Sequence, residues 1–246
     1  MLRMLFNEPR RKDEGELLKA NQAIHGYIEL IRDIPVQERN PQERRYYVWC
    51  GSFVRSLDEL EQSQYAAARY GERVRSAYLD EMDDNELDDY HRHLYFYKNA
   101  IIRLFAILDK LGQFMNERFR LRTEEIKARF SYFTVLRNMH TNGLYTELEE
   151  QLFRLKEQYE EPVERLRIER NLEIHTINAD LLDDLLRVSE TNDGSEQRIR
   201  TENIREHMQD LASGCEMTYH AVCLIFSYIT KLTESSGRYP HDRSKA

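Results

Sequence analysis

The sequence predicts an all-α fold, an up-and-down bundle of long helices in a single domain over residues 1–246. Composition is the first indication, because five prolines, nine glycines and 33% charged residues suit long helices better than a sheet-rich fold. The second is that apolar residues recur with the helical period along most of the chain. The third is that capping and turn signals separate these periodic stretches, with no internal repeat and no clear linker between them.

Two helices are expected in the N-terminal third of the chain. Residues 1–12 are interpreted as a loose arm, and helical periodicity starts near Asp13 and ends at Pro35, since proline interrupts a helix. A second helix should start between Asn40 and Glu43. That stretch offers a capping side chain, a proline at the first helical position and an acid in the first turn.

The middle of the chain combines an acidic segment with a long apolar helix. Seven acids lie between Asp80 and Asp89, without the fixed spacing and the glycine of a calcium loop. We interpret this segment as a solvated connection that leads into a helix N-terminus. The helix from Leu87 to Arg118 is strongly apolar along one side and is expected at the centre of the bundle.

A basic cluster follows that helix and is predicted as the RNA-binding region: Arg118, Arg120, Arg122 and Lys127. Two interpretations are open, because basic residues also favour a solvated helix C-terminus through the helix dipole. The formal net charge is −8, so no overall basic field attracts nucleic acid. Any RNA site must therefore be a local patch of this kind, which contacts phosphates.

The C-terminal half is expected to contain four further helices. The first ends near His140, and the second is short and opens at Thr146–Glu149, which has the form of a capping box. The third covers about residues 162–190 and starts at a proline, which is tolerated where a helix begins. The fourth covers about residues 196–234, and residues 235–246 are interpreted as a disordered tail.

The helix predicted for residues 162–190 has two apolar stripes, and we call it the motif helix. The first stripe includes Val163, Leu166 and Ile174, the second includes Ile168, Leu172 and Leu182, and the solvated face includes Arg165, Glu169 and Glu173. A helix with two apolar stripes should be covered from two directions, one of them by a second subunit. Arg170 projects onto the first stripe, and a buried guanidinium needs a paired or hydrogen-bonded role.

The six residues from Arg170 to His175 resemble the Arg-x4-6-His motif of the HEPN superfamily, in which a polar residue such as Asn171 often follows the arginine. Arg200 and His207 also satisfy the spacing, with a threonine after the arginine, so Asn171 favours the first copy. The resemblance covers about residues 85–235 and leaves residues 1–84 as additional helices. It implies an all-helical bundle, often dimeric, with the motif at the dimer cleft.

The resemblance also implies a chemistry, because many HEPN domains are metal-independent ribonucleases. The ribose 2′-OH would attack the phosphate, with His175 as general base or acid and Arg170 stabilising the developing charge. Asn171 would orient His175 or bind a phosphate oxygen. The alternative is a non-catalytic HEPN-like dimer that binds nucleotide, RNA or a partner protein. In that case Arg170 would be only the ion-pair partner of an acid on a neighbouring helix.

The expected partners are a second copy of the chain, RNA or a nucleotide, and an antitoxin-type protein if the chain is a toxin or defence effector. We expect no cofactor and no metal, since His91 and His93 point apart on a helix. The three cysteines form no Cys-x-x-Cys pair and the N-terminus lacks a signal peptide's apolar core, so a cytoplasmic location is expected. The apolar run from Ala221 to Ile229 is too short to span a membrane.

Overall fold

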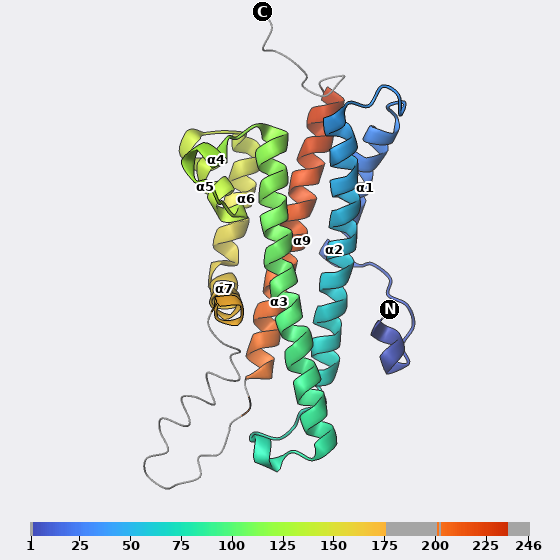
Figure 1. Ribbon diagram of the computed structural model, residues 1–246, viewed down its shortest axis with the longest axis vertical. Helices are drawn as coiled ribbons and strands as arrows, with labels where there is room; N and C mark the ends of the chain where they lie inside the picture. The colour runs from blue at the N-terminus through green and yellow to red at the C-terminus, as the bar shows by residue number, and fades with distance from the viewer. Residues whose placement is uncertain (1, 176–200, 202, 236–246) are drawn as a thin grey trace, which may run out of the picture. The chain divides into compact units, whose positions relative to one another are not determined.

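The computed structural model describes residues 2–175, 201 and 203–235, with only the backbone of His175, and all regular structure in this part is helical (Figure 1). The predicted all-α class is therefore confirmed. The α-helices are α1 (Gly15–Arg32), α2 (Pro41–Gly71), α3 (Asp84–Phe119), α4 (Thr123–Ile126), α5 (Tyr132–Asn142), α6 (Thr146–Gln158), α7 (Glu160–His175) and α9 (Ile204–Ser235). Two short 3-10 helices, η1 (Leu2–Phe6) and η2 (Leu79–Glu81), precede α1 and α3.

Local capping explains where several helices begin. At the start of α2 the Asn40 side chain accepts a hydrogen bond from the Glu43 N–H (2.9 Å), and the Glu43 carboxylate accepts one from the Asn40 N–H (2.8 Å). Before α3, Asp83 accepts from two backbone N–H groups, so the acidic segment leads into a helix N-terminus as predicted. The capping box predicted at Thr146 is wrong, because Tyr145 occupies the N-cap position without a side-chain bond.

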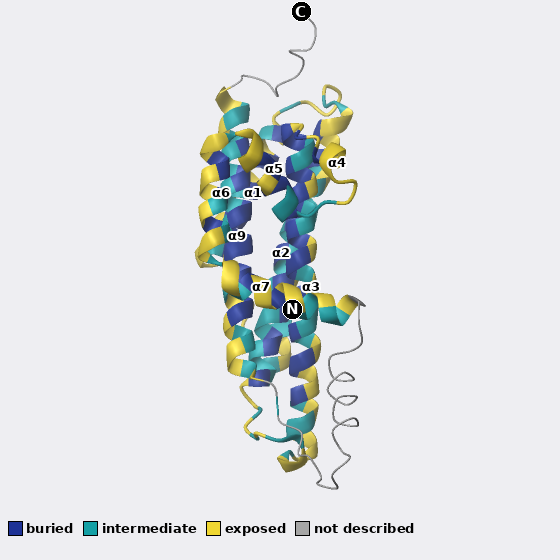
Figure 2. Ribbon diagram, turned by 90° about the vertical axis from the view of Figure 1, so that its left-hand side faces the viewer, coloured by how far each residue is buried: buried dark blue, intermediate teal, exposed yellow. Residues whose placement is uncertain are grey.

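The described chain forms two compact units, and three helices contribute to both. Unit 1 combines Met1–Arg10, Leu60–Phe105 and Glu160–Cys215, and unit 2 combines Arg11–Glu59, Ala106–Tyr159 and Glu216–Ala246. Helices α2, α3 and α9 each cross from one unit to the other along their length. Buried positions run as stripes along the long helices, as Figure 2 shows.

Unit 2 is built around an aromatic core. The rings of Phe53, Phe114 and Phe226 lie 5.2–5.8 Å apart between centroids, and Tyr27 contacts Phe226 at 5.9 Å. These rings come from α1, α2, α3 and α9, so one cluster joins four helices, and aromatic side chains bury a large apolar area. Helices α5 and α6 lie side by side in the same unit (Figure 1).

The N-terminal arm of unit 1 is not loose, and that prediction is wrong. Residues 2–6 form η1, and the Arg3 guanidinium pairs with the Glu61 carboxylate on α2. The Phe6 ring packs against Tyr70 with the centroids 5.0 Å apart. A charged pair and an aromatic contact therefore fix a segment whose composition gave no helical period.

Two predicted helix starts near the C-terminus also need correction. Helix α7 begins at Glu160, two residues before the expected proline, and α9 begins at Ile204 rather than near Glu196. The later start of α9 follows from its neighbours, since Thr201 donates its N–H to the Ala77 carbonyl (2.9 Å) and Asn203 caps the helix by accepting from the Glu206 N–H. The predicted continuation of the motif helix and the predicted tail lie outside the described residues. No helix in the described part has an apolar stretch long enough to cross a bilayer.

Candidate functional site

Helix α7, which carries the first half of the motif helix, packs on α3 and α9 in unit 1 through charged side chains. Residues 165, 169 and 173 are spaced by four and therefore share one face of α7. Arg165 makes two bonds to Asp210 of α9, Glu169 accepts a hydrogen bond from the Tyr97 hydroxyl (2.6 Å), and Glu173 lies 3.3 Å from the Lys98 ammonium. Arg165 is exposed as predicted for a solvated face, whereas Glu169 and Glu173 are only partly exposed, and a neighbouring helix supplies a partner for each of the three charges.

The apolar residues of α7 divide differently from the prediction. Val163 and Leu166 are buried, as expected for the first stripe. Ile174, which belongs to the same predicted stripe, is 48% exposed, and Ile168 of the second stripe is 52% exposed. The described residues of a single chain thus leave both isoleucines open to solvent.

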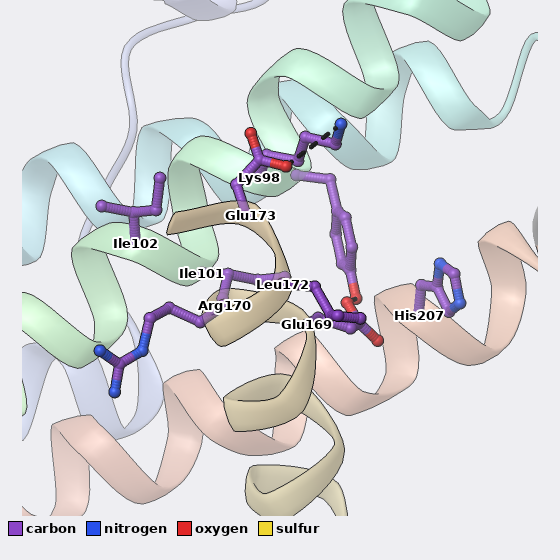
Figure 3. A pocket seen from close by; sticks show the side chains of 9 residues that line it. Lys98, Ile101, Ile102, Glu169, Arg170, Leu172, Glu173 and His207 are labelled. Carbon is purple, nitrogen blue, oxygen red and sulfur yellow. Dashed lines mark hydrogen bonds and ion pairs between the residues drawn. The ribbon is translucent and has the colours of Figure 1, made fainter. Parts of the chain in front are cut away.

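A cavity of about 190 Å³ lies where α7 meets α3 and α9 (Figure 3). Three aliphatic side chains line it: Ile101, Ile102 and Leu172. Polar residues from all three helices surround this apolar surface, among them Lys98, Glu173 and His207. The cavity is therefore mainly apolar with ionisable groups around it, a combination typical of small-ligand sites.

Three rings are stacked beside this cavity, and two of them, Tyr97 and His207, line it. Tyr97 lies between His93 and His207, with centroid distances of 5.9 and 5.4 Å and interplanar angles of 14° and 12°. The same tyrosine donates its hydroxyl hydrogen to Glu169, and His93 bonds the Ala67 carbonyl through Nδ1 (2.8 Å). Tyr97 therefore links α3, α7 and α9 at one point.

A metal site at the histidines of α3 receives no support from the geometry. His93 is buried against the Ala67 carbonyl, while the neighbouring His91 is exposed. Within the described residues no group of three His, Cys, Asp or Glu side chains is placed to hold a metal ion.

Arg170 also lines the cavity, and its environment differs from that of the other arginines on α7. Its guanidinium carbon lies 4.9 Å from the centre of the Phe105 ring, a cation–π contact. In Figure 3 the guanidinium points away from Glu169 and His207. Arg165 is paired with Asp210 and Arg167 with Glu164, but no carboxylate or hydrogen-bond acceptor in the described part of the chain pairs with Arg170. The predicted acid on a neighbouring helix is not found there.

The other predicted catalytic residues are placed only in part. Asn171 is exposed, and the side chain of His175 lies outside the described residues. Of the second sequence match, His207 faces the cavity and Arg200 is outside the described residues. The contributions of Tyr97 and Lys98 were missed, because on α3 they look like ordinary positions of a long bundle helix.

The predicted basic cluster belongs to unit 2 and does not act as one surface. Arg118 is buried, and its guanidinium donates to the Thr233 hydroxyl (3.3 Å), so its assignment as a phosphate contact needs correction. The other three residues, Arg120, Arg122 and Lys127, are exposed. Arg122 lies 3.8 Å from Glu125, a distance at which the two charges interact weakly in water.

A family model described as Cthe2314-like HEPN matches residues 49–230, from within α2 to within α9. No curated protein and no solved structure matches the chain.

Proposed function

The chain belongs to the Cthe2314-like HEPN family, and on this premise we propose that it is a metal-independent endoribonuclease of the toxin or defence type. The substrate is RNA, because the reaction uses the ribose 2′-OH as nucleophile. Attack of this oxygen on the adjacent phosphorus breaks the bond to the 5′-oxygen of the next nucleotide. One product ends in a 2′,3′-cyclic phosphate and the other begins with a 5′-OH.

The environment of Arg170 is the observation that supports this proposal most directly. An arginine keeps its charge at every physiological pH, and a structural arginine inside a protein is normally paired with a carboxylate. Arg165 on the same helix shows that pairing, whereas Arg170 rests on the Phe105 ring without an acid among the described residues. A guanidinium beside a cavity, with an Nε that has no partner among the described residues, suits a phosphate oxygen, which it binds in the same geometry as a carboxylate.

His175 and Asn171 complete the proposed chemistry. Imidazole changes charge near neutral pH, so His175 can take the proton of the 2′-OH or give one to the leaving 5′-oxygen. Asn171, one helical turn before His175, is within reach to orient it. Arg170 neutralises the charge that builds on the phosphate in the transition state.

The proposed enzyme is a homodimer, and two features of α7 support this. Positions 170 and 175 are five residues apart, so they point about 140° away from each other on one helix. A two-fold axis that pairs two copies of the helix can place Arg170 of one chain near His175 of the other. The exposed Ile168 and Ile174 supply an apolar surface for such a contact.

Three exposed residues of unit 2 remain proposed phosphate contacts for the RNA: Arg120, Arg122 and Lys127. Phosphate contacts depend on salt and not on base sequence. Replacing Arg120 and Arg122 by alanine should therefore weaken RNA binding in all sequence contexts and flatten its salt dependence.

The proposal is tested by comparing Arg170→Ala and His175→Ala with Arg167→Ala, a control on the exposed side of the same helix. The first two should lower the rate of RNA cleavage by at least about 100-fold, the usual effect of losing an acid–base or charge-stabilising group. The control should keep its rate, and excess EDTA should change nothing. Mass spectrometry should find the cyclic phosphate, and RNA with 2′-deoxy residues should not be cut.

The outcome that contradicts the proposal is equally defined. If the purified dimer binds RNA without cleaving it and Arg170→Ala leaves binding intact, the non-catalytic HEPN-like alternative holds instead. Circular dichroism and melting temperatures of all three variants show whether a lost activity is simply a lost fold.

A further inference from the structure

The cavity beside α7 has the size and surface of a pocket for one flat ring system. Pockets for drug-sized ligands measure roughly 300–1,000 Å³, whereas this one measures about 190 Å³. Ile101 and Ile102 on α3 and Leu172 on α7 form its aliphatic surface, and Ile101 is buried beneath it. Aliphatic side chains pack well against the face of an aromatic ring, so this surface suits one planar ring system.

The polar groups around the cavity match the edge of a nucleobase. The Lys98 ammonium and the Glu173 carboxylate lie 3.3 Å apart, and Figure 3 shows them side by side. This pair therefore presents one hydrogen-bond donor beside one acceptor. The Watson–Crick edge of each RNA base presents an acceptor next to a donor, and single-stranded RNA is recognised through such edges.

The position of Arg170 links the cavity to the phosphate chemistry. Arg170 and Leu172 line the same cavity from the same turn of α7. Arg170 therefore adds a cation to the lining of this cavity, which suits the negatively charged phosphate of a nucleotide. From these three observations we infer that the cavity binds one nucleobase of the RNA substrate, with Lys98 and Glu173 reading its edge. The inference rests on the proposed ribonuclease function and adds to it the part that holds the base.

A side chain from the second copy of the protein is the competing occupant. Four ionisable residues border the cavity, namely Lys98, Glu169, Arg170 and Glu173. An apolar side chain inserted among them would remove them from water without offering them new hydrogen bonds, which is unfavourable. A nucleotide offers polar groups at the base edge to Lys98 and Glu173 and a negative charge at the phosphate to Arg170, so it suits these three residues better than an apolar side chain does.

The test uses a short RNA with 2′-fluoro groups in place of every 2′-OH, which cannot be cleaved by 2′-OH attack. A single abasic nucleotide is moved through this RNA, and the binding of each version is measured by fluorescence anisotropy. At one position the loss of the base should weaken binding by about tenfold, the effect expected for one stacked base. At the other positions the Kd should change less than about twofold.

Two variants assign that position to the cavity. Leu172→Trp fills the cavity, and Glu173→Gln removes the acceptor's charge while keeping the side-chain shape. Either variant should weaken binding of the complete RNA. Either should also reduce the penalty, that is, the loss of affinity caused by the abasic nucleotide at the sensitive position. The control is Glu164→Trp at an exposed position of α7, which should leave the penalty unchanged. Melting temperatures of both variants should be measured, and Glu173→Gln, which keeps the side-chain shape, should remain folded even if Leu172→Trp does not.

The results separate this inference from the proposed function. If normal RNA is not cut but the position-dependent loss occurs and depends on the cavity, the base pocket stands and the ribonuclease proposal fails. If RNA is cut and no position is sensitive, or both cavity variants keep the full penalty, the inference is overturned. The inference is also overturned if Leu172→Trp dissociates the dimer and no position of the RNA is sensitive to loss of its base. In that case the cavity holds a side chain of the second copy. Failure of the 2′-fluoro RNA to bind at all also overturns the inference.

Discussion

Arg165 of α7 and Asp210 of α9 are joined by two parallel hydrogen bonds, with Nε 2.6 Å from Oδ2 and Nη2 2.7 Å from Oδ1. The two partners differ in exposure, since the Asp210 side chain is 7% exposed and the Arg165 side chain is 48% exposed. Hydrogen bonding to Asp210 raises the pKa of the Arg165 guanidinium above its usual range. The pair thus holds α7, which carries the motif, against α9. Asp210 depends on this pairing more than Arg165 does, because its carboxylate is buried.

We predict that Arg165→Ala lowers the melting temperature more than Asp210→Ala does. The first variant leaves a buried carboxylate without its bidentate partner, whereas the second leaves a guanidinium that water can reach. The double variant Arg165→Ala/Asp210→Ala should therefore be more stable than Arg165→Ala alone, as a thermal melt of the four proteins can show. Equal effects of the two single variants, with additivity in the double, would mean that the pair contributes little.

The exposed isoleucines of α7 predict the behaviour of an assembly variant. Ile168→Glu and Ile174→Glu should give a folded monomer, because both positions are open in the single chain and a charge there disrupts only a subunit contact. Sedimentation velocity measures the mass, and circular dichroism measures the helix content. A monomeric unmodified chain at high micromolar concentration would remove the dimer from the proposal.

Replacing a helical glycine by alanine should change the stability of the protein in opposite directions at Gly112 and Gly26. A Cβ atom at Gly112 of α3 would lie 2.8 Å from the Tyr132 Cα on α5, so Gly112→Ala must push two helices apart and lower the stability of the protein. A Cβ atom at Gly26 of α1 meets nothing within 4 Å. Gly26→Ala should therefore raise the free energy of unfolding by about 0.5–1 kcal/mol, the helix-propensity difference. Urea denaturation of both variants checks the pair, and a stabilising Gly112→Ala would contradict the close approach of α3 and α5.

Cys50 predicts a loss of stability at alkaline pH. Burial raises the pKa of its thiol from an ordinary value of 9.0 to about 12. Between these values the unfolded chain has released the thiol proton and the folded chain still holds it, so the free energy of unfolding falls as pH rises. Burial also raises the pKa of Tyr46, from 10.0 to about 12, so the window from pH 9 to 10 reports mainly on the thiol. Cys50→Ala should reduce the fall of the unfolding free energy between pH 9 and 10, as measured by urea denaturation at several pH values. The same fall in the variant and in the unmodified protein would exclude Cys50 as the cause.

The fold could be predicted from the sequence because its signals are local. The capping residues at Asn40 and Glu43 act within one turn of helix, and the apolar period of α3 extends over many turns. The start of α9 was missed although Asn203 and Glu206 form a local cap there. What the sequence does not show is the bond from Thr201 to Ala77, more than a hundred residues earlier, just before this start. Periodicity alone does not contain such a distant contact.

The candidate site was predictable in its motif and not in its surroundings. Arg170 and its neighbours on α7 could be found from spacing, because the motif lies within two turns of one helix. The faces of α7 were assigned wrongly, because the period method treats charged residues as solvated and here Glu169 and Glu173 have partners on α3. Tyr97 gave no signal at all, since its role comes from a ring stack and a hydroxyl contact made by three separate helices.

The sharing of α2, α3 and α9 between the two units limits how the length of this protein can vary in evolution. One extra residue inside any of these helices would rotate everything beyond it by about 100° and advance it by about 1.5 Å. Within a unit, side chains beyond the insertion would then leave the faces that they bury, because the other helices of that unit keep their places. Relatives should therefore differ in length in the connections between helices, and insertions within the three shared helices should be rare or occur in compensating groups of seven, which restore the original face.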